Sequence, residues 1–305
     1  MYALPTDCGL RDTSVSYTHL PSTIDQKVGS LVVTKDRDKI KEMAKELADS
    51  LSLRPIELLA AHIMYKDNFT AELTLYDMMA RYSEIIRSEN VSQTEKAIQC
   101  VNRITEPDPQ EKYLSNEMKI KFIVYGLDLI NSDVKFQDNL IDAAKQHGNE
   151  AMIEIIDAWH FNRYSKGLLN AIIEFKHESI SYLINKLGED DSKDELLAHI
   201  GKPAFDILLL KMKSKDMKLR YDAADVLVKM FTYNPDVVSE YIKAIENKDL
   251  NFIKNNYPFY LRLEYRNLED LLLKVLDRNF SVQLCEEFMN YGTLSTCLLY
   301  TSRCV

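Results

Sequence analysis

The chain is short of the residues that interrupt helices. Only 8 glycines and 8 prolines occur among its 305 residues, below the usual shares of about 7% and about 5%. Because glycine and proline punctuate turns and strands, their scarcity favours long helices joined by short links. Strand-like alternation is missing as well, and the β-prone run at residues 31–34 is too short and isolated to build a sheet. We therefore predict an all-α fold.

Cysteines and long apolar runs are also sparse. Outside the two ends of the chain only Cys100 and Cys285 remain, far apart and without metal-type spacing. This pattern excludes a disulfide framework and a zinc site and favours a reducing compartment. No apolar run approaches the roughly 20 residues needed to span a bilayer. We expect a cytoplasmic protein without a membrane partner.

Motifs that carry chemistry are missing too. The sequence has no glycine-rich phosphate loop, no Gly-x-Ser-x-Gly elbow and no Cys-x-x-Cys. The acidic cluster Asp190, Asp191 and Asp194 does not have EF-hand spacing, and acidic residues are favoured at a helix N-terminus by the helix dipole. We expect no enzymatic activity, no metal and no cofactor.

Both ends of the chain resemble translated sequencing adapter. One DNA string, CTGTCTCTTATACACATCT, encodes residues 297–302 in one frame and residues 15–20 in another. Segments of such origin are set aside when a fold is predicted. We therefore expect residues 1–21 and 295–305 to be non-native ends, and the natural sequence to be a truncated fragment.

The charge balance is acidic, with 47 Asp and Glu against 38 Lys and Arg and a formal net charge of −9. Surplus negative charge repels phosphate backbones, so we expect no nucleic-acid partner. The same surplus would attract a partner of basic character.

Apolar residues recur at helical spacing along the chain. Ile40, Met43, Ala44 and Leu47 follow the amphipathic pattern, and Pro55 suits the first turn of the next helix. Residues 107–109, Pro-Asp-Pro, cannot be helical and indicate a linker between hairpins at 22–106 and repeats at 113–294. Three pairs have the form of helix start signals: Ser92 with Glu95, Ser192 with Glu195, and Asn234 with Pro235.

The segment at residues 200–230 resembles a HEAT repeat. Pro203 and Ala204 open a first helix, Asp216 can cap the second, and Ala223 and Ala224 are small enough to allow close helix packing. The resemblance, which extends at lower specificity over the C-terminal half, implies an α-solenoid of stacked helical hairpins similar to bacterial HEAT-repeat proteins. A hairpin of this kind cannot bury its apolar face alone, so neighbours must stack on it.

Helical geometry divides the second helix of this repeat into two faces. Leu219, Ala223, Val226, Leu227 and Met230 share the apolar face. Tyr221, Asp222 and Asp225 lie on the opposite face, which we take as the candidate interaction face.

Our interpretation is a protein–protein interaction scaffold with a protein or peptide partner. The alternative is a HEAT-like nucleic-acid-binding protein or DNA glycosylase, for which the aromatic run at residues 159–164 and the stretch at 257–265 could stack on bases. We expect Trp159 and Phe161 to fill the space between two helices instead. The pair His177-Glu178 resembles those of deoxyhypusine hydroxylase, a HEAT-repeat di-iron enzyme, but such a site needs several pairs.

Overall fold

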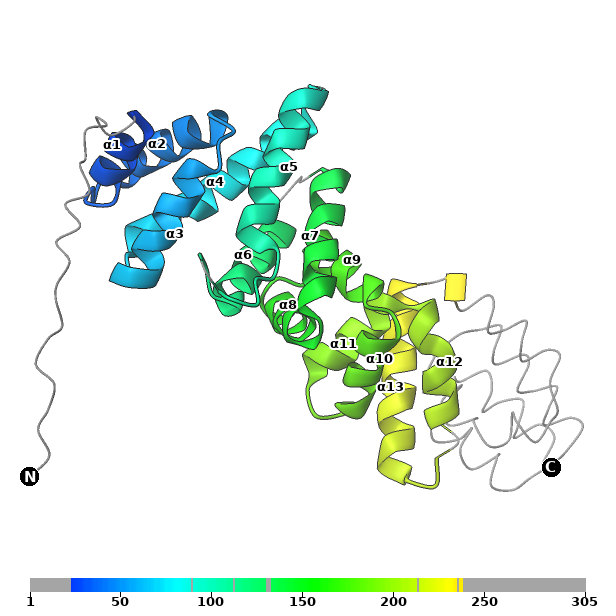
Figure 1. The fold of residues 1–305 in the computed structure, drawn as a ribbon. Coiled ribbons are helices and arrows are strands. Elements are labelled where there is room, and N and C mark those ends of the chain that lie inside the picture. Colours follow the sequence, from blue (N-terminus) through cyan, green and yellow to red (C-terminus); the bar gives the residue numbers. More distant parts are fainter. Residues whose placement is uncertain are drawn as a thin grey trace, which may run out of the picture. The chain divides into compact units, whose positions relative to one another are not determined.

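The computed structural model describes residues 23–88, 90–111, 113–129, 133–212, 214–234 and 236–237. These residues form 13 helices and no strand (Figure 1), which confirms the all-α prediction. The helices are α1 (Thr23–Leu31), α2 (Arg37–Asp49), α3 (Arg54–Lys66), α4 (Phe69–Arg87), α5 (Val91–Thr105), α6 (Asn116–Asp128), α7 (Val134–His147), α8 (Asn149–Phe161), α9 (Lys166–Glu174), α10 (His177–Asn185), α11 (Asp191–Ile200), α12 (Lys202–Lys211) and α13 (Met217–Tyr233). The expected non-native ends and the aromatic stretch at residues 257–265 lie outside the described residues.

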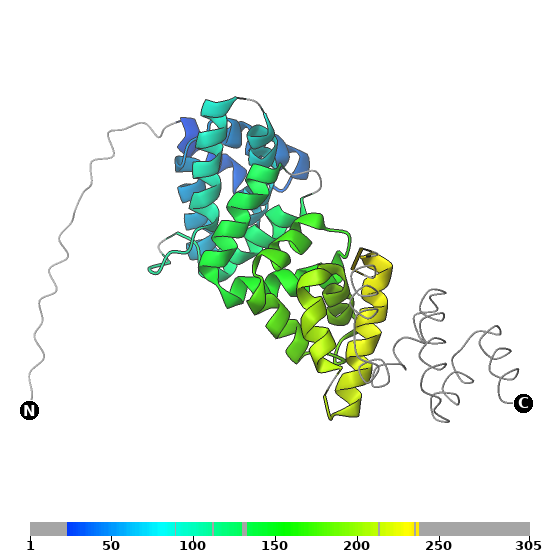
Figure 2. The same ribbon diagram turned by 90° about the vertical axis from the view of Figure 1, so that its right-hand side faces the viewer.

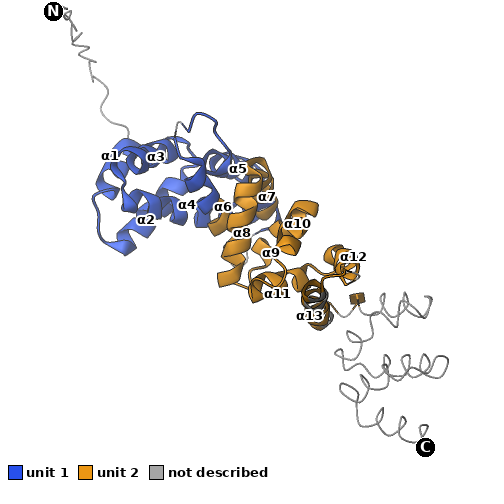
Figure 3. Ribbon diagram, turned by 90° about the horizontal axis from the view of Figure 1, so that it is seen from below, with its two compact units in different colours: residues 1–122, 133–136 blue, residues 123–132, 137–305 orange. Residues whose placement is uncertain are grey.

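The chain divides into two compact units (Figure 3). Helices α1–α5 belong to the first unit, α8–α13 belong to the second, and α6 and α7 contribute residues to both. The Pro-Asp-Pro segment at residues 107–109 is non-helical, as predicted, and lies in the loop that joins α5 to α6. Within the described parts of both units, no helix is long and apolar enough to cross a bilayer.

Within each unit, helices that are two apart in the chain pack side by side. In the first unit α1 packs on α3 and α2 on α4, and in the second α10 packs on α12 and α11 on α13. Figures 1 and 2 show these neighbours from two directions. Sequential helices also pack on each other, as α3 does on α4 and α12 on α13. This alternation is what stacked helical hairpins produce, because each helix then contacts both its partner and its counterpart in the next hairpin.

Asparagine side chains fasten one hairpin to the next at three turns. The amide of Asn68 donates to the backbone oxygen of Val32 at 3.1 Å, 36 residues earlier. Asn162 donates to Asp128 Oδ1 at 2.7 Å, 34 residues earlier. Asn234 donates to the oxygen of Ala198 at 2.7 Å, again 36 residues earlier.

The last two of these asparagines have the same backbone conformation. Asn162 has φ −131° and ψ 75°, Asn234 has φ −132° and ψ 70°, and each is the C-cap of its helix. The same residue type and conformation therefore recur at the ends of α8 and α13, with hydrogen bonds that span 34 and 36 residues.

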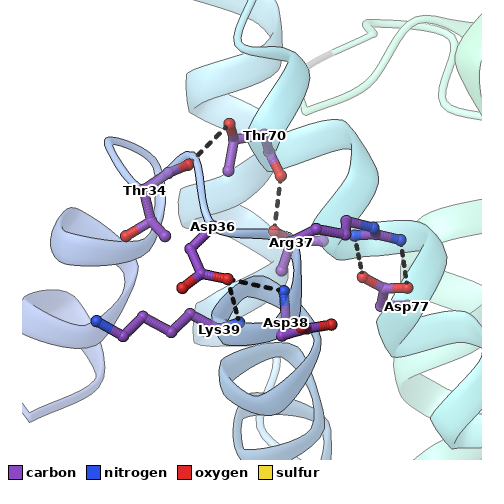
Figure 4. A network of polar contacts seen from close by, with 8 residues as sticks. Thr34, Asp36, Arg37, Asp38, Lys39, Thr70 and Asp77 are labelled. Carbon is purple, nitrogen blue, oxygen red and sulfur yellow. Dashed lines mark hydrogen bonds and ion pairs between the residues drawn. The ribbon is translucent and has the colours of Figure 1, made fainter.

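Ion pairs between neighbouring hairpins follow a similar step. In the first unit Arg37 forms two hydrogen bonds to Asp77, at 2.6 and 2.8 Å across 40 residues (Figure 4). Beside this ion pair, the Thr70 hydroxyl donates a hydrogen bond to the backbone oxygen of Thr34 at 3.5 Å. In the second unit Lys193 lies 3.4 Å from Asp157. Exposed pairs of this kind contribute little each, but their positions repeat the hairpin spacing.

The apolar face predicted for α13 is the buried one. Ala223, Val226, Leu227 and Met230 have no exposed surface, and Leu219, the fifth residue predicted for this face, is half-buried. Asp216 caps the helix as predicted, accepting hydrogen bonds from the backbone nitrogens of Lys218 and Leu219. Pro203 stands in the first turn of α12. The segment that carries the HEAT resemblance therefore folds as a hairpin.

Two of the three predicted helix start signals are wrong, each by two positions. Asn90 caps α5 through the nitrogen of Gln93, two positions before Ser92. Asp190 caps α11, so Ser192 lies inside that helix. Asn234 ends α13 and also precedes a new helical turn, as predicted, because Asp236 and Val237 are helical and the Val237 nitrogen donates to the Asn234 oxygen at 3.0 Å. At the starts of α5 and α11, a side chain with the same capping chemistry, two positions earlier, satisfies the free backbone groups.

We expect Asn234→Ala to lower the free energy of unfolding by about 1 kcal/mol, because it removes the hydrogen bond to Ala198. Urea denaturation followed by circular dichroism measures the change. Asn185→Ala is the matched control, since Asn185 is exposed at the end of α10. Equal changes for both variants would contradict a fastening role for Asn234.

We expect Ala223→Leu to lower the free energy of unfolding by roughly 1–3 kcal/mol through overpacking between α13 and its neighbours. Thr232→Leu adds the same side chain at an exposed position of the same helix and should change stability by less than about 0.5 kcal/mol. Thermal melts of the two variants give the comparison, and a stable Ala223→Leu protein would show that this face has spare room.

Candidate interaction surfaces

The face proposed on α13 is only partly open. Asp225 is exposed, whereas Asp222 is half-buried. A Cβ added at Gly188, which has φ +75°, would lie 2.2 Å from Asp222 Oδ2, so the carboxylate fills the space that this glycine leaves. Tyr221 lies in α13, but its side chain is outside the described residues.

Acidic groups from the start of α11 lie beside this face. Asp190 accepts hydrogen bonds from the nitrogen and hydroxyl of Ser192, at 2.9 and 2.7 Å, and these bonds lower the pKa of Asp190. The side chain of Asp191 is 97% exposed and lies 3.6 Å from Lys229. We call Asp190, Asp191, Asp222 and Asp225 the acidic edge.

A buried carboxyl group lies behind the acidic edge. Asp194 is buried and accepts a hydrogen bond from the Gly188 nitrogen at 3.1 Å. Burial raises the pKa of Asp194, the hydrogen bond opposes that rise, and the charges of Asp222 and Asp191 add to it. The Lys229 ammonium opposes the charges of Asp222 and Asp191, so burial is the main cause of the raised pKa of Asp194.

Three aromatic rings form a row across the second unit. The edge of Trp159 meets His199 with ring centroids 5.4 Å apart, and His199 stacks on Tyr233 at 3.9 Å. The rings come from α8, α11 and α13. Trp159 is buried, which confirms the prediction that its side chain packs between helices. We call these three rings the aromatic row.

Phe161 contradicts the same prediction for its own side chain. Its side chain is 86% exposed, and that of Tyr164, in the following turn, is 95% exposed. The C-cap residue Asn162 turns the chain away from α8 at this point, so Phe161 projects from the end of the helix and does not fill the gap between helices. Arg163, which lies between Phe161 and Tyr164 in the sequence, forms an ion pair with Glu195.

In the first unit the loop between α5 and α6 borders a polar cavity of about 370 Å³, the loop pocket. Its lining residues include Arg103, Glu106, Asp108, Tyr113 and Lys119. The Arg103 guanidinium lies over the Tyr113 ring, 3.9 Å from its centroid. Nothing in the sequence pattern singled out this pocket.

Exposed apolar side chains gather at two adjacent turns of the same unit. Val33 follows α1, and Tyr65 and Phe69 flank the turn between α3 and α4. The hydrogen bond from Asn68 to Val32 holds these turns together.

His177, of the His-Glu pair, is exposed and lies 3.4 Å from the Ser181 hydroxyl. Among the described residues, no three His, Cys, Asp or Glu side chains are grouped as a metal site would require.

Comparison with known proteins does not extend this description. No protein-family model matches the chain, and no curated protein sequence matches it. A solved structure of an engineered protein is 14% identical to it, covering 92% of this chain and 91% of that one, with a TM-score of 0.25. A likeness at that score gives no basis for assigning a fold family or a function. The described part of the chain is therefore defined by its own geometry as an all-α protein of packed helices.

We expect part of the stability of the second unit to be lost on acidification through His199. Burial lowers the pKa of His199, with Glu195 opposing the shift. The stabilisation is fully present above the unfolded-state pKa of about 6.5 and is lost as pH falls through the lowered folded-state pKa. Urea midpoints measured from about pH 7.5 downward should fall less in His199→Phe, which keeps a ring in the row and cannot titrate.

His177→Gln, at an exposed histidine, is the control and should follow the wild-type curve. If His199→Phe also follows it, His199 does not contribute to the pH dependence.

Proposed function

We propose that the chain is a HEAT-like α-solenoid that acts as a protein-interaction scaffold in the bacterial cytoplasm, with no catalytic activity of its own. The observation that carries the proposal is the recurring step of 34 to 36 residues in the asparagine hydrogen bonds. Helical-hairpin repeats have lengths of about 33 to 47 residues. The HEAT-like segment at residues 200–230 supplies the family resemblance.

Repeat arrays are suited to binding other macromolecules, because each added repeat lengthens the exposed surface. Each repeat contacts its neighbours, so an array exposes a long surface in proportion to its length. An extended or helical peptide can lie along such a surface and contact several repeats at once. This argument favours a macromolecular partner over a small substrate for the array.

The charge of the acidic edge favours a basic partner. Asp191 is almost completely exposed, Asp225 is exposed, and the chain carries a net charge of −9. Surface carboxylates raise the rate at which a cationic partner meets the surface and favour it over an anionic one. We propose that a lysine- and arginine-rich segment of a protein binds here, with Asp222 and Asp225 from the face predicted on α13.

Fluorescence anisotropy with labelled peptides tests this proposal. A lysine-rich helical peptide should bind, a glutamate-rich peptide of equal length should not, and affinity should fall with added salt. Asp191→Lys/Asp225→Lys should weaken binding about tenfold or more, since exposed pairs contribute up to about 1 kcal/mol each. The charge-matched control Glu42→Lys/Glu95→Lys alters exposed residues of the first unit. Equal weakening by both double variants would mean that net charge alone is responsible.

A second candidate function rests on Phe161 and Tyr164. Two almost fully exposed aromatic side chains, three residues apart in the sequence, could stack on unpaired bases, as in proteins that bind single-stranded nucleic acid. Binding of single-stranded or duplex DNA at about 0.15 M salt, lost in Phe161→Ala/Tyr164→Ala, would favour this alternative over the scaffold.

A further inference from the structure

Two positively charged side chains, Lys119 and Arg103, line the loop pocket, and each has N–H donors for which no acceptor is found among the described residues. Lys119 is 3% exposed, and its ammonium group donates to the neutral backbone oxygen of Glu106 at 2.8 Å. An ammonium group has three N–H donors, and this is the one acceptor found for it among the described residues. A buried lysine with a single neutral hydrogen-bond acceptor is unusual, because a buried charged group is normally paired and fully hydrogen-bonded.

Arg103 lies in the same lining and is also incompletely bonded. Its Nη2 donates to Glu57 Oε1 at 3.0 Å, and its flat face covers Tyr113. Its Nε is buried and has no hydrogen-bond partner among the described residues. Burial lowers the pKa of Lys119, the charges of Asp108, Glu111 and Glu106 oppose this shift, and the like charge of Arg103 adds to it.

Several carboxylates near the pocket already accept hydrogen bonds. Asp108 Oδ1 accepts from the Gln110 nitrogen at 3.0 Å, and Glu111 Oε1 accepts from the Asn116 nitrogen at 3.2 Å. Glu57 is paired with Arg103. These acids hold the loop and the start of α6 in place. Arg103 Nε and two N–H groups of the Lys119 ammonium could therefore donate hydrogen bonds to a bound ligand.

We propose that the loop pocket binds the carboxylate group of a small organic acid or of a peptide C-terminus, with Lys119 and Arg103 as its recognition residues. A carboxylate accepts hydrogen bonds from both cations at once and separates their like charges. A singly charged group suits the site better than a phosphate, because Glu106 and Asp108 also line the pocket and would repel a dianion. The volume of about 370 Å³ falls in the range of small-molecule sites. This proposal is independent of the scaffold function.

A matched series of aromatic probes tests the charge requirement by calorimetry and NMR titration. Benzoate should bind, the neutral benzamide should bind at least about tenfold more weakly, and phenyl phosphate should not exceed benzoate. A short peptide with a free C-terminus, compared with its C-terminal amide, separates the two sources of the carboxylate. Lack of benzoate and peptide binding up to about 10 mM, or equal binding of benzoate and benzamide, would overturn the proposal.

Variants of the full chain assign the effect to the pocket. Lys119→Met keeps the size of the buried side chain and should weaken benzoate binding about tenfold or more. Lys121→Met is the control on the same helix, because Lys121 is exposed and pairs with Glu117. Arg103→Lys retains the charge but loses the Nε donor, and serves if Lys119→Met fails to fold by circular dichroism. Unchanged affinity in a folded Lys119→Met or Arg103→Lys protein would contradict the assignment.

Discussion

A pair of amphipathic helices leaves apolar surface on both of its outer sides, and within each unit of this chain further helices cover that surface. The residues buried on α13 illustrate it, because Ala223 and Val226 have no exposed surface in a helix that packs on both α11 and α12. Within each unit, stability therefore depends on contacts between helices that follow each other or are two apart in the chain. The asparagine hydrogen bonds fix how neighbouring helices are aligned along their axes. A hydrogen bond requires a defined distance and angle, whereas apolar contacts tolerate small shifts between helices.

The helical nature of the chain could be predicted well from the sequence, since the scarcity of glycine and the apolar period both depend on local physics. The apolar face and the Asp216 cap of the HEAT-like segment were predicted correctly for the same reason. Capping residues were harder to place. Asn90 and Asp190 compete with nearby serines of similar capping ability, and the packing of the hairpin, which decides between them, is not visible in a local pattern.

The candidate surfaces depended on tertiary contacts and were predicted less well. Helical spacing predicted that Asp222 lies on an open face. Asp222 is half-buried instead, because its carboxylate occupies the space that Gly188 leaves by having no side chain. Phe161 was expected to be buried because it is aromatic and lies next to Trp159, yet the turn at Asn162 exposes it. Lys119 is the extreme case. Lysine is almost never buried, so composition and periodicity both assign it to solvent, and only the fold of the loop around it reveals its position.

The position of Trp159 has a practical consequence. It is the single tryptophan of the chain, it is buried, and its ring edge lies against His199. Its intrinsic fluorescence therefore originates in the second unit alone, and a neighbouring imidazole quenches indole emission more strongly when it is protonated. Emission intensity and wavelength would thus report the separation of α8 from α11 without any label, while far-ultraviolet dichroism follows the helices of both units. Any difference between the two signals during denaturation would reveal whether the two units unfold in one step or in two.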